Sequence, residues 1–67
     1  MNEYIDVHPN IAFGKPCIRG TRISVNFILE LISLGWTIDT IREQYPQLTE
    51  KQIQTAIKFA AQEEHAV

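Results

Sequence analysis

The most constraining feature of this sequence is a change of pattern near Ser24. Residues 4–23 contain two of the three prolines and two of the three glycines, with β-compatible residues only in short runs between them. From Ser24 onward, apolar residues recur with the spacing of a helix. A chain of 67 residues has room for one domain with a thin core. We therefore predict a single domain over residues 1–67, with a β-hairpin element at 4–23 and three helices at 24–64.

Two groups of turn-forming residues divide the first segment. They are Gly14-Lys15-Pro16 and Arg19-Gly20-Thr21, and Gly20 is the position where a positive φ is most expected. The β-compatible runs around these turns predict short strands and a tight hairpin, at about 11–13, 16–18 and 21–23.

The second segment carries the start and stop signals of three helices. Ser24 is the expected N-cap of the first helix, and Gly35 stands where a C′ glycine ends it. Thr37 is expected to cap a second helix that Pro46 ends. The run Thr49-Glu50-Lys51-Gln52 is a capping-box pattern that opens a third helix. The residues expected to face the core are Phe27, Ile28, Leu31, Ile32 and Leu34, then Ile41 and Tyr45, then Ile53, Ala56, Ile57 and Ala60.

A short turn between the last two helices is the layout of a helix-turn-helix. A generic three-helix bundle is the alternative, since any small helical domain needs short turns. Either arrangement gives a mainly α fold in which short N-terminal strands precede three helices.

The most specific part of the sequence is the run from His8 to Val25. It contains His8-Pro9-Asn10-Ile11 and Gly14-Lys15-Pro16-Cys17-Ile18-Arg19-Gly20-Thr21-Arg22, and Tyr45-Pro46-Gln47-Leu48-Thr49 follows later. With these motifs the chain, from about Tyr4 to Ala61, resembles the bacterial family called domain of unknown function 433. The resemblance implies a homeodomain-like or winged-helix-like helix-turn-helix after a small β element. It also implies an antitoxin that binds its own promoter and neutralises a PIN-like ribonuclease toxin encoded next to it.

One face of the third helix carries the candidate base-reading residues. Glutamine can bond adenine and lysine can contact guanine or phosphate, so this face has suitable chemistry for duplex DNA. An ordinary solvated helix face would look the same, and both interpretations stay open. The residues share a face at i, i+3, i+4 and i+7: Lys51, Gln54, Thr55 and Lys58.

Three cations in the turn-rich segment are candidate phosphate contacts: Lys15, Arg19 and Arg22. They could equally pair with an acidic partner protein, or with a carbonyl or acid of this chain. The whole chain has six Lys and Arg against eight Asp and Glu, a net charge of −2, which argues mildly against strong nucleic-acid binding. DNA affinity is therefore expected to need a dimer or a toxin-bound complex.

A homodimer is expected independently, because short strands leave open edges and the first helix is apolar around most of its circumference. Phe59 lies off the inward stripe of the third helix and is the candidate anchor for a partner. Trp36 is either a core residue or an interface anchor. The full set of candidate partner or dimer contacts is Phe27, Leu29, Trp36 and Phe59.

Several classes of protein are excluded. A single cysteine, Cys17, and two histidines cannot form a disulfide framework or a zinc-finger ligand set. Cys17 and His8 lack a third orienting group, and no P-loop spacing occurs, so we expect no catalytic residue, no metal and no cofactor. No apolar run approaches the roughly 20 residues of a membrane span, and the first residues lack a secretory signal pattern. We expect a cytoplasmic protein without membrane contact.

Two functions remain at this stage. The first is an antitoxin-like DNA-binding protein. The alternative is a protein-interaction module that keeps the helix-turn-helix shape without reading DNA.

Overall fold

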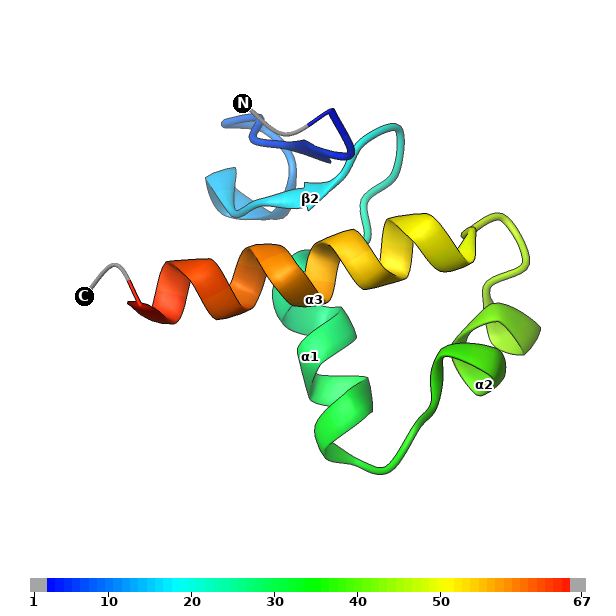
Figure 1. Cartoon of the computed structure of the whole chain (residues 1–67). Helices are drawn as coiled ribbons and strands as arrows, with labels where there is room; N and C mark the ends of the chain where they lie inside the picture. Colours follow the sequence, from blue (N-terminus) through cyan, green and yellow to red (C-terminus); the bar gives the residue numbers. More distant parts are fainter. Residues whose placement is uncertain (1–2, 66–67) are drawn as a thin grey trace.

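The computed structural model describes residues 3–65, which form a short strand pair followed by three helices (Figure 1). The predicted mainly α fold is confirmed. In chain order the elements are β1 (Ile5–Asp6), a 3-10 turn η1 (Ala12–Gly14), β2 (Cys17–Ile18), α1 (Val25–Ser33), α2 (Ile38–Gln44) and α3 (Glu50–His65).

The strands form an antiparallel ribbon at the N-terminal end. Ile5 lies opposite Ile18, and Asp6 lies opposite Cys17. On the other side of β2, the Ile18 amide donates to the Ile23 carbonyl at 2.9 Å. The chain reverses at Gly20, whose φ of 82° is the positive value that the sequence predicts there. The strand predicted at 16–18 and the tight turn after it are therefore confirmed, whereas the strand predicted at 21–23 is reduced to one isolated bridge at Ser24.

The strand predicted at 11–13 is wrong, because these residues enter a left-handed turn. Ala12, Phe13 and Gly14 have φ values of 51°, 58° and 81°. Two backbone hydrogen bonds close the turn, from the Gly14 amide to the Ile11 carbonyl at 3.0 Å and from the Lys15 amide to the Ala12 carbonyl at 3.1 Å. The partner of β2 is β1, which lies earlier in the chain. A short apolar run does not reveal its own strand partner.

The predicted ends of α1 are confirmed. The Phe27 amide donates to the Ser24 hydroxyl at 3.0 Å, which caps the first turn. At the other end, the Gly35 amide bonds the Ile32 carbonyl and the Trp36 amide bonds the Leu31 carbonyl, each at 3.0 Å. This pair of bonds is a Schellman motif, and it requires the positive φ that Gly35 adopts at 96°.

The starts of α2 and α3 are also those predicted from the sequence. Thr37 and Thr40 exchange side-chain to backbone hydrogen bonds of 3.2 and 2.8 Å, which forms a capping box. Thr49 and Gln52 form the second capping box, with bonds of 2.8 and 3.1 Å. Tyr45 is the C-cap of α2, directly before Pro46. Helix α3 continues to His65, one residue beyond the predicted boundary.

The core lies where α3 packs across α1, with the ribbon and α2 completing its enclosure (Figure 1). The largest fully buried side chains come from every part of the fold: Ile18, Ile28, Ile41, Leu48 and Ile53. The inward sets predicted for the three helices are buried or half-buried, with one exception. Leu34 is 70% exposed, because it is the C-cap residue where the chain leaves α1. The core is thus built from small contributions of all elements.

Candidate nucleic-acid interface

Helix α3 has an exposed face and a buried face. Ile53, Ala56 and Ala60 are buried against the rest of the domain. The capping box at Thr49 fixes where the helix begins, and its 3.6-residue period then sets which residues point outward. Of the four predicted base-reading residues, three are exposed and Thr55 is half-buried at the edge of the face; the exposed ones are Lys51, Gln54 and Lys58.

A hydrogen bond that the sequence analysis missed occupies the start of this face. Gln54 Nε2 donates to Glu50 Oε2 at 3.0 Å. The i, i+4 spacing of the two residues is the signal that could have revealed it. The Glu50 carboxylate interacts favourably with the N-terminal end of the helix dipole but repels a phosphate. Gln54 must therefore exchange this partner before its amide can read a base.

The three predicted phosphate-binding cations lie on the ribbon and its turns, not on α3. Lys15, Arg19 and Arg22 are all exposed. Arg19 Nε lies 3.9 Å from Asp6 Oδ2, so this cation already has a loose acidic partner. Among the residues described, no ion pair joins a ribbon cation to α3. The two predicted groups of DNA contacts therefore belong to separate elements.

Helix α2 presents mixed charge to solvent. Asp39 and Glu43 are exposed, as is Arg42 between them. In a helix-turn-helix complex, the helix before the reading helix crosses the phosphate backbone. Two exposed carboxylates on α2 oppose that approach, and one arginine only partly offsets them.

The predicted partner contacts on the helices are less exposed than anchors usually are before binding. Phe27, Leu29, Trp36 and Phe59 are all half-buried and pack against the core. The ring of Phe27 meets Tyr45 edge to face, with 5.8 Å between centroids. In the described part of the chain, the large apolar side chains that are mostly exposed are Val7, Phe13 and Leu34, at 55%, 99% and 70%. The sequence analysis missed Phe13, because a strand at 11–13 would have given it neighbours on a sheet.

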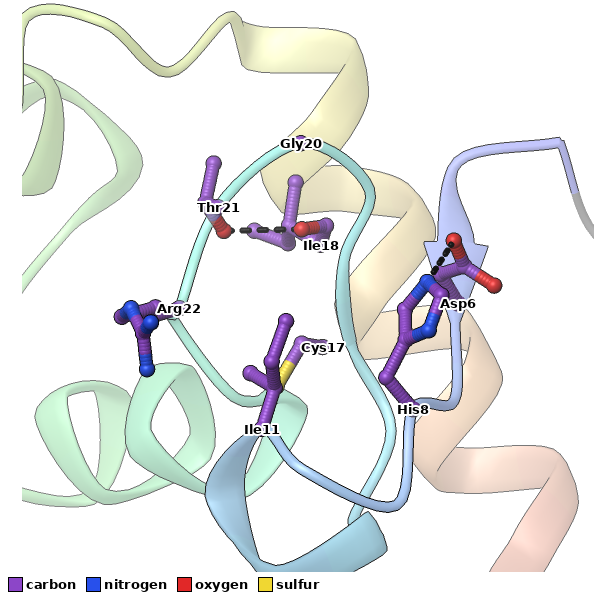
Figure 2. Close-up of a pocket in the computed structure, with 8 residues that line it drawn as sticks. All are labelled: Asp6, His8, Ile11, Cys17, Ile18, Gly20, Thr21 and Arg22. Carbon is purple, nitrogen blue, oxygen red and sulfur yellow. Dashed lines mark hydrogen bonds and ion pairs between the residues drawn. The ribbon is translucent and has the colours of Figure 1, made fainter.

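The surface of the ribbon and its turns contains an open hollow of about 330 Å³ (Figure 2). His8 Nε2 lies 3.1 Å from Asp6 Oδ2, and Asp6 Oδ1 accepts a hydrogen bond from the Val7 amide at 3.1 Å. The hollow has apolar residues at its centre and charged residues at its rim. Its wall has Asp6 and His8 on one side, Arg22 on the other, and Ile11, Cys17 and Ile18 between them.

The Cys17 thiol lies in the wall of this hollow but is buried. Its Sγ donates a weak hydrogen bond of 3.5 Å to the Lys15 carbonyl, and burial raises the pKa of the thiol above its usual 9.0. The neutral thiol, a poor nucleophile, is therefore the form that the fold favours. Among the side chains that the structure describes, no group of three or more from His, Cys, Asp or Glu could hold a metal ion.

We expect Cys17 to resist alkylation in the folded protein. Iodoacetamide at pH 8 should modify it far more slowly in buffer than in concentrated urea, as measured by mass spectrometry against a small free thiol. Because the pKa is raised in the fold, the stabilisation from this group is complete below pH 9.0 and is lost as pH rises above it. Equal alkylation rates in buffer and in urea would contradict the burial of this thiol.

The helices within residues 3–65 include none that is long and apolar enough to cross a membrane.

Comparison with known proteins places this fold in a family. A crystal structure of a DUF433 member protein from Anabaena variabilis ATCC 29413 is similar, with a TM-score of 0.87 and 25% sequence identity. The match covers 94% of this chain and 62% of that chain, so this chain spans less than two thirds of that relative's length. No curated protein matches. The family described as "Protein of unknown function (DUF433)" matches residues 5–60, and the chain belongs to this family.

Proposed function

We propose that this protein is a helix-turn-helix DNA-binding protein that reads duplex DNA through the exposed face of α3. The observation that carries the proposal is the placement of Lys51, Gln54 and Lys58 on one exposed face, opposite the buried Ile53 and Ala56. Cationic and amide side chains at these spacings match the contacts that a reading helix makes in a major groove.

The biological role proposed with this activity is that of an antitoxin. The protein binds its own promoter as a homodimer in the cytoplasm and neutralises a PIN-like ribonuclease encoded by the adjacent gene. Support for this role comes from the resemblance of the Gly14 to Arg22 motif to antitoxin-like family members.

Electrostatics limits what one copy can do on DNA. The chain contains six basic and eight acidic residues. The exposed Asp39 and Glu43 on α2 repel a phosphate backbone. A dimer presents two α3 faces to two half-sites, which raises affinity by linking two weak contacts. Lys15, Arg19 and Arg22 on the ribbon are the proposed phosphate contacts of each copy.

A DNA titration with a salt series tests the proposal. Fluorescence anisotropy would use the duplex directly upstream of the gene, with and without the product of the adjacent reading frame. The expected result is binding whose log K falls with log salt at a slope of about −0.9 for each phosphate neutralised. An unrelated duplex of equal length is the control for specificity. Absence of binding at low salt, with and without the neighbour, would reject the DNA-reading function.

The second candidate is a protein-interaction module that does not read DNA. Its support is the acidic character of the surface that would have to face DNA: Glu50 begins α3, and Asp39 and Glu43 are exposed on α2. In this case the neighbouring gene product binds in a complex that salt weakens little, because apolar contacts are not screened. The same salt series therefore distinguishes the two functions.

A further inference from the structure

We infer that the ribbon carries a self-complementary docking surface, through which two copies of this chain pair by exchanging Phe13. The surface is defined as Phe13, Lys15 and the hollow of Figure 2, and each Phe13 ring sits in the hollow of the other copy. The inference deepens the proposed function, since it assigns the homodimer of that proposal to specific residues.

Phe13 combines two unfavourable features that a partner would explain. The residue is 99% exposed, so its whole ring meets water. Its φ of 58° lies in the left-handed region, which is unfavourable for a residue with a side chain. Hydrogen bonds from Gly14 and Lys15 nevertheless close the turn, so the ring is presented on a fixed backbone. An aromatic side chain on an ordered backbone has only two side-chain torsions left to fix when it binds, so it loses little conformational entropy, which is typical of an interface anchor.

The hollow has the size and the lining to receive an aromatic ring. Its volume of about 330 Å³ exceeds the roughly 150 Å³ of an apolar cavity that holds benzene. Ile11 and Ile18 supply apolar wall, and Arg22 on the rim can lie over the face of an inserted ring. Phe13 does not line its own hollow, so the site is open to the ring of another copy.

The positions of anchor and hollow fit two-fold symmetry. Ile11, in the wall of the hollow, is only two residues before Phe13, so both halves of the contact lie on the same ribbon. A two-fold axis requires one patch that contains both halves, because each copy then gives and receives the same contact. The pairing closes at two copies and leaves no unsatisfied anchor.

Charges on the surface are complementary in this arrangement. Lys15 follows two residues after Phe13, is exposed, and forms no ion pair with any of the residues described. Asp6 on the rim of the hollow already has partners in its own copy: His8 Nε2 and the Val7 amide at 3.1 Å each, and Arg19 Nε at 3.9 Å. Seating Phe13 in the partner's hollow brings Lys15 toward the partner's rim, where this carboxylate attracts it.

The area that this contact buries is small. One aromatic side chain buries about 150–250 Å². Two therefore fall short of the roughly 1,000 Å² that a stable interface buries, even when Val7, which is 55% exposed, adds to them. A weak, reversible dimer is the expected state of the free protein.

Sedimentation equilibrium of the full chain, from micromolar to low millimolar concentration, tests the inference. The wild type is expected to show a reversible monomer–dimer equilibrium. Phe13→Ala should raise the dissociation constant at least tenfold, and Lys15→Glu should also raise it. Leu34→Ala is the matched control, because Leu34 is an exposed apolar residue at the end of α1 outside this surface, and it should change the constant less than twofold.

Two results would overturn the inference: a monomer at every concentration, or equal effects of Phe13→Ala and Leu34→Ala. Thermal unfolding of both variants checks that they fold, and no loss is expected for Phe13→Ala because the ring has no packing to lose. The DNA titration keeps the two proposals apart. A monomer that binds promoter DNA would reject this surface and the homodimer but not the DNA-reading activity, and a Phe13-dependent dimer that binds no DNA would reject that activity but not this surface.

Discussion

Replacing Ile53 by alanine is expected to lower the free energy of unfolding by about 2–5 kcal/mol. Ile53 has no exposed surface and belongs to the core cluster that joins α3 to Ile28 of α1 and Ile18 of β2. A chain of 67 residues is expected to have only about 3–10 kcal/mol of stability in total, so this variant loses a large part of it. Urea denaturation followed by Trp36 fluorescence gives the measurement.

Ile57→Ala is the matched control for this prediction. Ile57 lies one turn further along α3 and is half-buried, so the same chemical change removes less buried apolar surface there. Both changes gain the same intrinsic helix propensity, which cancels in the comparison. The expected loss at Ile57 is less than half of that at Ile53. Equal losses would mean that α3 is rotated differently about its axis, and the exposed face assigned to Lys51 and Lys58 would be wrong.

Reversing the charge of Lys51 and Lys58 together is expected to weaken promoter binding about 100-fold, roughly 1.4 kcal/mol for each residue. The double variant Lys51→Glu with Lys58→Glu removes two cations from the exposed face of α3 and adds repulsion toward phosphates. The slope of log K against log salt should become shallower, because fewer counterions are released. Anisotropy titration of the upstream duplex measures both quantities.

The single variants Lys58→Glu and Arg42→Glu are the matched pair for this experiment. Each changes the net charge by the same amount, from −2 to −4, but Lys58 lies on the exposed face of α3 and Arg42 lies on α2. Lys58→Glu should therefore weaken binding about tenfold more than Arg42→Glu does. If both weaken it equally, binding responds only to overall charge and α3 is not the reading helix.

Local signals made the helices predictable. The hydroxyl of Ser24 and the capping boxes at Thr37 and Thr49 each bond a backbone amide three residues away, so these bonds are encoded within a few residues. Gly35 ends α1 for an equally local reason, since the closing motif needs a positive φ there. The outward face of α3 followed from the same short-range period.

The strand region was less predictable, because its pairing is not local. The partner of Cys17–Ile18 is Ile5–Asp6, eleven residues earlier at the nearest pair, and the apolar run at 11–13 looked equally suitable. Ala12 and Phe13 adopt left-handed φ values that residues with side chains seldom adopt, so no propensity predicts them.

The sequence by itself determined three capped helices, their order, the turn at Gly20 and three of the four residues predicted on the exposed face of α3. The tertiary structure decided which apolar side chains remain uncovered: Phe27 and Trp36 pack against the core, whereas Phe13 and Leu34 meet solvent. The physical reason is the range of the interactions. Caps and helical periods depend on hydrogen bonds across three or four residues, whereas burial depends on where every other element of the chain lies.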